Sequence, residues 1–343
     1  MKLEPLTGIQ DIEWDRTIAG WQGKLIFHHS AWLKFMKANR PDLRLMRFRL
    51  INDNKIKGYF VGFLNKKGPF LIIGSPLYGC FTDFMGPISD NSLEVETFLK
   101  ALESWCRKER VHFLQLGHPI LSEKEMCRKG YVVNRMSVYN VPLSSSENTM
   151  WQHITGKCRN RIRKGYKNGL RVELCNDMSI VEDYYAQHTD VFAHQGLPPK
   201  YPIKTVNSLV HNLMPAGMLL AIRIRYKGQS IATGLFPHDN RYLYSFGIAA
   251  WTKYRHLCPN ELLYWSAMQW GGNQGLQSFY IGGKYRQPTT GGVFKKNFNG
   301  EVVPVLRYVK AMSPLLRMAY RSYCILRDMR TRSKEPVPIP PTG

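Results

Sequence analysis

The sequence is poor in acidic residues and lacks the patterns of a metal site or a membrane span. Its 343 residues include 48 Lys and Arg but only 25 Asp and Glu, a formal net charge of +23. Seven cysteines are scattered without a Cys-x-x-Cys pair, which argues against bound metal and favours reduced thiols. No stretch approaches the roughly 20 apolar residues of a membrane span, and the N-terminus lacks a signal-peptide core. We expect a cytoplasmic protein with no metal.

Several enzyme motifs are missing as well. The sequence has no Gly-x-x-x-x-Gly-Lys-[Ser/Thr] loop, no Gly-x-Gly-x-x-Gly after a strand and no Gly-x-Ser-x-Gly elbow. The chain therefore shows no phosphate loop or serine nucleophile of these kinds. With 44% apolar and only 21% charged residues it is globular, and its length indicates two domains at roughly 150 residues each.

The positive charge is concentrated in the second half of the chain. Residues 1–150 hold 21 Lys and Arg against 15 Asp and Glu, whereas residues 151–343 hold 27 against 10. Such a field attracts polyanions and speeds their encounter. It indicates a nucleic acid, an anionic membrane surface or a phosphorylated substrate, without selecting among them.

The order of predicted elements is that of a mixed α/β protein. In the first half the patterns predict helices at 27–39 and 93–109 and strands within 45–64, at 111–116 and at 131–141. The polar segment 143–148 is the predicted boundary between domains 1–145 and 149–310. In the second half we predict helices at 149–168, 179–194 and 260–271, and strands at 170–174, 218–226, 229–237, 242–248 and 277–281.

Residues 311–343 form a tail of different character. Within 313–330 apolar residues gather near one helical face and arginines occupy the rest, so this helix could dock on its own domain or lie on anionic lipid. The second option predicts peripheral contact with the inner face of the membrane. The last residues, 335–343, are Pro-rich and predict a disordered end.

A basic run at 157–167 is the first candidate site. It carries six positive charges and no acid, and Arg159, Arg163 and Lys167 recur every four residues on one helical face. A phosphate would relieve the repulsion between them, and arginine is suited to forked phosphate contacts. The alternative is a solvated basic face without a ligand.

Two further stretches are candidates for binding or catalysis. In 188–201, His188 precedes a loop stiffened by two prolines, and such rigid loops commonly carry binding groups. His188 could equally be a structural residue. In 291–300, glycines adjoin Lys295 and Lys296, whose charges can hold a phosphate or stabilise an oxyanion.

Taken in order, these stretches resemble the FemAB-like branch of the GNAT acyltransferase superfamily. No single motif carries the resemblance, which covers nearly the whole chain. Its matching residues are Ile26–Trp32, Pro76–Gly79, Gly86-Pro87, Trp151, Lys157–Leu170, His188-Thr189, Gly196–Pro198, Pro259–Trp265, Ile281–Gly283, Phe294-Lys295 and Phe298–Gly300.

The resemblance implies tandem GNAT-like domains and transfer of an acyl or aminoacyl group to an amine of a phosphorylated or lipid-linked cell-envelope precursor. In that family the helix matching Arg159–Lys167 contacts acceptor phosphates, and the lysine matching Lys295 assists at the reacting carbonyl. We expect Lys295, Phe294 and His188 to be catalytic. The expected substrate-binding residues are Arg159, Arg163, Lys164, Lys167, Tyr201, Asn260 and Tyr280.

The donor is left open by the sequence. No permanently bound cofactor is expected, and the acyl co-substrate is aminoacyl-tRNA, acyl-CoA or an acyl carrier protein. Residues 254–259 stand where a Gly-rich pyrophosphate turn for coenzyme A would be, so acyl-CoA is not favoured, and tRNA is a candidate partner. The alternatives are an acyl-CoA-dependent N-acyltransferase of a small amine or sugar, and a non-catalytic protein that binds RNA or membrane.

Overall fold

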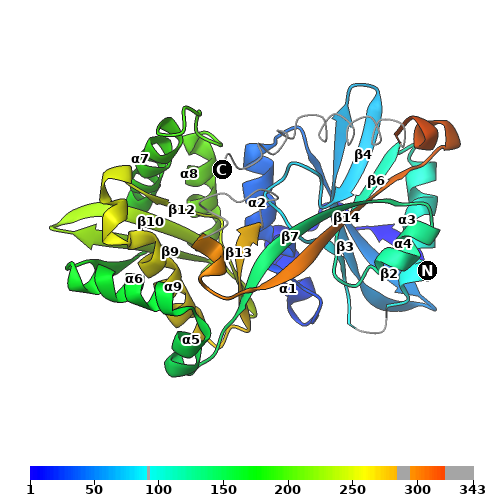
Figure 1. Ribbon diagram of the computed structural model, residues 1–343. Coiled ribbons are helices and arrows are strands. Elements are labelled where there is room, and N and C mark those ends of the chain that lie inside the picture. The colour runs from blue at the N-terminus through cyan, green and yellow to red at the C-terminus, as the bar shows by residue number, and fades with distance from the viewer. Residues whose placement is uncertain (91–92, 284–293, 321–343) are drawn as a thin grey trace, which may run out of the picture.

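The computed structural model describes residues 1–90, 93–283 and 294–320, which form two lobes joined by long strands (Figure 1). The first half contains β1 (Lys2–Pro5), α1 (Asp11–Ala19), η1 (Ile26–His28), α2 (Ser30–Asn39), β2 (Arg44–Asn52), β3 (Lys55–Lys67), β4 (Phe70–Ser75), β5 (Gly86–Ile88), α3 (Val95–Lys108), β6 (Phe113–Leu116), α4 (Glu123–Arg128) and β7 (Val132–Pro142). The predicted helices and strands of this half are present, with shifted ends.

The second half begins with two helices that straddle a short break. It contains α5 (Glu147–His153), α6 (Gly156–Lys167), β8 (Arg171–Cys175), α7 (Ser179–Ala193), α8 (Ile203–Leu213), β9 (Leu219–Tyr226), β10 (Gln229–Pro237), β11 (Tyr242–Tyr244), β12 (Gly247–Ala250), η2 (Thr252–Leu257), α9 (Pro259–Asn273), β13 (Ser278–Gly283) and β14 (Glu301–Ala311). Residues 314–320 are helical, and the rest of the predicted tail helix lies outside the described residues.

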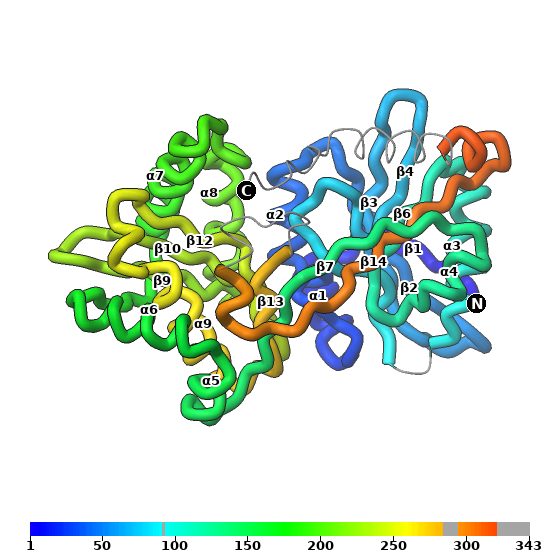
Figure 2. Tube along the Cα trace, in the orientation of Figure 1, coloured from blue at the N-terminus to red at the C-terminus, as the bar shows by residue number. Residues whose placement is uncertain are grey.

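A ten-stranded sheet runs through both halves of the described chain. Its order is β1-β2-β3-β4-β6-β14-β7-β13-β11, with β5 beside β3. Strand β14 pairs with β7 along Glu301–Val309 and with β6 only at Tyr308–Ala311, so the end of the chain returns to the first half. Figure 2 shows this return, with β14 beside β7 across the middle of the molecule. The predicted domain division stays a prediction. The large sheet contains strands from both sides of the predicted boundary at residues 143–148.

Strand β14 was not predicted, and Pro304 explains why. Proline cannot donate to a strand ladder and usually marks an edge or the absence of a strand. Here β6 pairs with β14 only from Tyr308 onward, so Pro304 lies where β14 has β7 on one side alone. The absence of an N–H at Pro304 therefore removes no hydrogen bond to a second neighbouring strand.

The smaller sheet has the order β12-β10-β9-β8 and is antiparallel throughout. Helix α9 packs on one face of it with α6 against α9, and α7 packs on the other face. The predicted strand 242–248 is wrong as one strand, because the chain changes sheets within it. The N–H of Ser245 donates to Tyr280 O of the large sheet, whereas the N–H of Phe246 donates to Leu235 O of the small one. The two sheets separate at this point.

The single helix predicted at 149–168 is also wrong, because it is two helices. The Thr155 hydroxyl accepts the N–H of Cys158 at 3.2 Å and so begins α6 anew, two residues after α5 ends.

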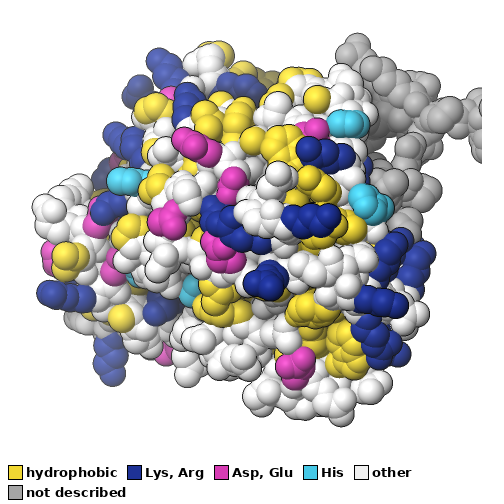
Figure 3. All heavy atoms as spheres, turned by 90° about the vertical axis from the view of Figure 1, so that its left-hand side faces the viewer, with side chains coloured by type: hydrophobic (Ala, Val, Ile, Leu, Met, Phe, Trp, Pro, Cys, Tyr) yellow, Lys and Arg dark blue, Asp and Glu magenta, His cyan; other side chains and the backbone are white. Residues whose placement is uncertain are grey.

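In Figure 3, which looks onto the outer end of the second half, Lys and Arg side chains gather toward the lower right with few acids among them. Among the described helices none is long and apolar enough to cross a bilayer.

One hydrophobic core is shared by the two halves. Helix α2 of the first half packs on α8 of the second, and Trp32 and Phe35 belong to the same buried cluster as Val206 and Leu209. Helix α8 was not predicted, although its apolar residues have helical spacing. Burial of the α2–α8 contact fixes how the two halves face each other.

The buried His28 and the half-buried His118 should make the protein less stable in acid. Burial lowers the pKa of His28 to about 3 and that of His118 to about 4, so both are neutral in the folded protein. The unfolded chain takes up their protons below its ordinary pKa near 6.5, so the free energy of unfolding falls as pH falls from 6.5 toward 4. For His28 we expect a loss of about 2 kcal/mol by pH 5.

The measurement is urea unfolding at pH 7 and pH 5. His28→Gln should flatten the difference between the two pH values, while substitution of the exposed His211 by Gln should leave it unchanged. Equal pH dependence in His28→Gln and the unmodified protein would contradict the assignment.

Candidate active site between the two halves

Lys295 lies on a short helical turn that follows β13. Phe294 anchors this turn, because its ring stacks on Tyr264 of α9 (5.4 Å between centroids, 29°) and meets Phe298 edge-on. The Lys295 ammonium donates to Gly283 O at 3.2 Å. Burial lowers the pKa of Lys295 to about 8; the positive charge of Lys200 adds to this shift and the negative charge of Asp83 opposes it. Lys295 is therefore a cation at neutral pH that loses its proton more easily than an exposed lysine.

Asp83 reaches the same region from the first half, on the loop between β4 and β5. Arg307 of β14 holds this loop, since its guanidinium donates to Thr82 O and lies 3.9 Å from the Asp83 carboxylate. Burial raises the pKa of Asp83, while the positive charges of Arg307, Lys200 and Lys295 oppose the rise. Sequence analysis missed Asp83 and Arg307, because neither lies in a motif and their proximity depends on the return of β14.

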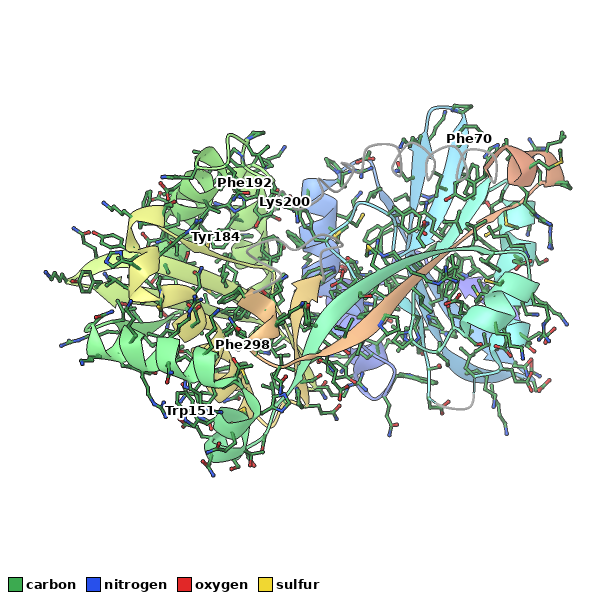
Figure 4. The ribbon with its side chains drawn as sticks, viewed as in Figure 1. Phe70, Trp151, Tyr184, Phe192, Lys200 and Phe298 are labelled. Carbon is green, nitrogen blue, oxygen red and sulfur yellow. The ribbon has the colours of Figure 1, made fainter. Side chains whose placement is uncertain are left out.

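The charges of Arg307, Lys200 and Lys295 all act on the pKa of Asp83, and we name these four residues the interlobe charge cluster. Asp83 lies on the β4–β5 loop, and Lys200 lies on the segment after α7. Lys295 lies on the turn after β13, and Arg307 lies on β14 itself. Figure 4 shows Lys200 on the side of the second lobe that faces α2. Three cations and one carboxylate leave the cluster with net positive charge, as binding of an anionic substrate or stabilisation of an oxyanion requires.

His188 lies beside this cluster and supports its backbone. Its ring stacks on Tyr201 (4.7 Å, 11°), and its Nε2 accepts the N–H of Lys200 at 3.3 Å. Burial, with a smaller contribution from the charge of Lys200, lowers the pKa of His188 to about 4, so the imidazole is neutral. The geometry shows a contact that positions Lys200; the catalytic role of His188 stays a prediction.

Tyr201 and Tyr280 connect the two halves through aromatic contacts. The Tyr201 hydroxyl hydrogen-bonds the Tyr184 hydroxyl at 2.7 Å, and its ring meets Phe81 of the first half edge-on. Burial raises the pKa of Tyr201 to about 12. Tyr280 contacts Phe84, the neighbour of Asp83, with 5.9 Å between ring centroids. The structure thus brings both predicted tyrosines close to the cluster, and their substrate-binding roles stay predictions.

Gly247 is required for the packing behind Tyr201. A side chain there would place its Cβ 2.2 Å from the Tyr184 hydroxyl oxygen and 3.4 Å from that of Tyr201. Only glycine leaves room for the tyrosine pair at the first residue of β12. The backbone at the separation of the two sheets is therefore fitted to these side chains.

The predicted residues of α6 are divided between two environments. The Arg159 guanidinium donates to the carbonyl oxygens of Trp151 and Ile154, at 3.1 and 2.7 Å, and so holds the corner between α5 and α6. Arg163 lies over the Trp151 ring, 5.3 Å from its centroid, and like Lys164 and Lys167 it is exposed. The shared cationic face predicted for this helix is thus made mainly by its exposed members.

The start of α6 adjoins the turn that carries Lys295. The N–H and the hydroxyl of Thr155 both donate to Asn297 O at 3.0 Å.

Asn260, in the first turn of α9, has a buried Oδ1 without a hydrogen-bond partner among the described residues. The described residues contain no group of three His, Cys, Asp or Glu side chains that could hold a metal ion.

Residues 154–291 match the family model of the acetyltransferase (GNAT) domain. The chain contains a GNAT domain. The match confirms the acyltransferase class predicted from the sequence. Lys200 lies within the matched residues, whereas Asp83, Lys295 and Arg307 lie outside them, so the interlobe charge cluster extends beyond the GNAT domain itself.

Solved structures show the same fold over nearly the whole chain. FemX superposes with a TM-score of 0.74 at 11% identity, covering 92% of this chain and 99% of FemX. The C-terminal domain of a putative lysylphosphatidylglycerol synthetase from Agrobacterium fabrum gives 0.57 at 15% identity, covering 92% and 96%. A tandem GNAT protein from the clavulanic acid biosynthesis pathway gives 0.53 at 9% identity, covering 91% and 99%.

These similarities confirm the predicted α/β fold of tandem GNAT-like domains and its FemAB-like form. At such low identities they establish the fold alone. No curated protein matches the chain in sequence. The residues of the site therefore have to be assigned from their own geometry.

Proposed function

We propose that the protein transfers an aminoacyl group from aminoacyl-tRNA to an amine of a phosphorylated or lipid-linked cell-envelope precursor. The observation that carries the proposal is the Lys295 ammonium, set among Lys200, Arg307 and Asp83 where the two halves meet. When an amine attacks an ester, negative charge develops on the carbonyl oxygen. A cation fixed beside that oxygen lowers the barrier.

The turn before α9 favours an aminoacyl ester over an acyl-CoA donor. A coenzyme A pyrophosphate is bound by free backbone N–H groups at a helix N-terminus. Here η2 occupies that turn, Cys258 N–H already donates to Arg255 O, and Pro259 at the start of α9 has no N–H. These two residues therefore offer no backbone donor to a pyrophosphate, whereas a tRNA can use the exposed lysines of α6.

The name of one similar structure supports this class of acceptor. The C-terminal domain from Agrobacterium fabrum is named as that of a putative lysylphosphatidylglycerol synthetase, a name that denotes a lysyl group on a phospholipid. The same fold is thus named together with a phosphorylated lipid in that protein. For this chain it supports a lipid-linked or phosphorylated acceptor.

The test is a transfer assay with two donor pools. The protein is incubated with charged tRNA or with mixed acyl-CoA, together with a lipid and nucleotide-sugar precursor extract, and acceptor mass shifts are read by mass spectrometry. Products with charged tRNA alone are the expected result. Products with acyl-CoA alone would replace the proposal with the acyl-CoA alternative, and no product with either donor would contradict both.

The exposed lysines of α6 should contribute to tRNA binding. Reversing two charges with Lys164→Glu and Lys167→Glu removes favourable phosphate interactions, and the slope of log affinity against log salt should fall by about 1 for each phosphate that is no longer neutralised. The measurement is a salt titration of tRNA binding. The matched control, Lys108→Glu with Lys124→Glu in the first half, changes the net charge equally and should bind nearly as the unmodified protein does.

Equal decreases in the two double variants would contradict the assignment. They would show that net charge, and not this surface of α6, governs the binding.

A further inference from the structure

One end of the large sheet carries a hollow that belongs to neither the interlobe charge cluster nor α6. Strands β4 and β6 begin there and β14 ends there, because Phe113 pairs with Ile72 on one side and with Ala311 on the other. The hollow has a volume of about 550 Å³, and its lining includes Phe70, Arg107, Arg110, His112, Met312 and Leu316. Figure 4 shows Phe70 at the upper end of the first lobe, away from the second lobe.

Contacts between the three strands fix the floor of this hollow. The Phe70 ring meets those of His112 and Phe113 edge-on, with 5.7 and 5.6 Å between centroids. His112 Nδ1 accepts the N–H of Leu71 at 3.0 Å, and the N–H of Met312 donates to His112 O at 2.9 Å. The hollow is therefore a built feature of the sheet end.

Cations surround the hollow. Arg107 lies in the last turn of α3 and keeps 61% of its side chain accessible, although its guanidinium lies 3.4 Å from Glu103. Arg110 follows that helix and is exposed. Lys67 is the cross-strand partner of Phe70, so both side chains leave the same face of the sheet. In the segments 65–71 and 105–113, Glu109 is the single acid against Lys66, Lys67, Arg107, Lys108 and Arg110.

Apolar side chains project from the same end of the molecule. The helix at 314–320 docks on the sheet through Tyr320, whose ring lies 5.6 Å from that of Phe113. Its Leu315 and Met318 are 80% and 67% exposed, and they share one helical face because they are three residues apart. Phe70 is 37% exposed. Apolar side chains gathered at a surface mark an interaction site.

An anionic membrane surface fits this combination of charge and polarity. The apolar side chains of an interfacial helix enter the boundary between headgroups and acyl chains, while lysine and arginine beside them meet the lipid phosphates. An RNA would pair with the cations but would leave Leu315 and Met318 in water. The apolar residues therefore favour a lipid over a nucleic acid.

We infer that Phe70, Leu315, Met318, Arg107 and Arg110 form a surface that binds an anionic phospholipid membrane. A headgroup phosphate enters the hollow lined by the two arginines. We name these five residues the sheet-end surface. The inference goes beyond the proposed function, because the surface binds the membrane whatever donor and acceptor the enzyme uses.

Vesicle sedimentation tests the inference without turnover, so its outcome is separate from that of the transfer assay. The full chain is mixed with vesicles of phosphatidylcholine alone or with one third phosphatidylglycerol, and bound protein is measured after centrifugation. We expect binding to the anionic vesicles that weakens with added salt, and little binding to phosphatidylcholine. Absence of binding to the anionic vesicles, or equal binding to both kinds, would overturn the inference.

A pair of charge variants separates this surface from the net charge of the protein. Arg107→Gln with Arg110→Gln should lower the affinity for anionic vesicles about 25-fold, since each cation near such a surface contributes a factor of about 5. The matched control, Lys227→Gln with Lys253→Gln, removes two exposed cations of the second half and should change the affinity by less than about 3-fold. Equal decreases in both pairs would overturn the inference.

A pair of apolar variants tests the part of the surface that RNA would not need. Leu315→Ser with Met318→Ser should lower the affinity about 10-fold, because less apolar surface leaves water on binding. The control pair, Ile12→Ser with Leu174→Ser, changes residues that are 69% and 58% exposed elsewhere and should bind as the unmodified protein does. All four positions are exposed, so folding should be kept, and the thermal unfolding midpoint verifies it.

Unchanged vesicle binding in the sheet-end variants would overturn the inference. If the same variants then lose tRNA binding, the surface belongs to RNA. If they lose self-association, it belongs to a second copy of the chain.

Discussion

Lys295→Met is expected to lower the rate of transfer by about 100-fold to 1,000-fold, as loss of one oxyanion donor does. The methionine has nearly the length of the lysine side chain but no charge to place beside the carbonyl oxygen. Phe294, which anchors the turn on Tyr264, is unchanged, and the hydrogen bond to Gly283 O that the variant cannot form is exposed to solvent. Turnover measured with charged tRNA should fall while the thermal unfolding midpoint stays nearly constant.

The matched control is Lys296→Met. Lys296 is the next residue on the same turn and is exposed, so its substitution removes an equal charge without changing the interlobe charge cluster. It should keep nearly the full rate. Retention of the full rate by Lys295→Met would remove Lys295 from the mechanism, and an equal decrease in both variants would assign the effect to net charge.

The pH dependence of the unmodified enzyme gives a second readout of the same group. The pKa of Lys295 is lowered to about 8, so its cationic form is complete well below pH 8 and is lost as pH rises through that value. If the ammonium stabilises the oxyanion, the rate should fall on the alkaline side with a midpoint near 8. In Lys295→Met this alkaline fall should disappear from the residual rate.

Lys310→Met is expected to destabilise the protein by about 3 kcal/mol, because it removes the buried cation of Glu103 and leaves this carboxylate only the longer ion pair with the exposed Arg107, at 3.4 Å. The Lys310 ammonium donates to Glu103 at 2.7 Å, and only 11% and 10% of the two side chains are exposed. Tyr131 donates to the same carboxylate oxygen at 2.9 Å. This pair ties β14, which also carries Arg307, to α3 of the first half.

Urea unfolding measures the effect, with Lys100→Met of α3 as the matched control. Lys100 pairs with Glu96 at 3.1 Å, but its side chain is 73% exposed, so its substitution should change the free energy of unfolding by less than about 1 kcal/mol. Adding Glu103→Gln to Lys310→Met removes the buried negative charge that has lost its nearest cation, and it should restore part of the stability. A small effect of Lys310→Met alone would contradict the importance of this link.

The residues of the second half could be predicted from the sequence because their signals are local. The Phe294-Lys295 pair, the basic run of α6 and the aromatic residues of α9 each lie within a short segment, and their order carried the resemblance to the FemAB-like branch. The predicted helix α7 and strands β9 and β10 also depend on local periodicity. Such features are read from neighbouring residues alone.

The rest of the site depends on contacts between distant segments. Asp83 and Arg307 are 224 positions apart in the printed sequence, and no spacing indicates that they meet. Arg159 was expected on a phosphate-binding face, but the break at Thr155 turns its guanidinium toward the carbonyl oxygens of α5. Hydrogen bonds to backbone groups several residues away decide such orientations, and composition does not report them.

The sequence by itself determined the acyltransferase class, the mixed α/β order and the excess of positive charge, because these follow from local patterns and from counting residues. The tertiary structure alone decided that β14 returns to the first half and that Asp83 joins Lys295. Strand pairing and burial are cooperative properties of segments far apart in the chain, so the cluster exists only once β7, β14 and the α2–α8 contact have formed.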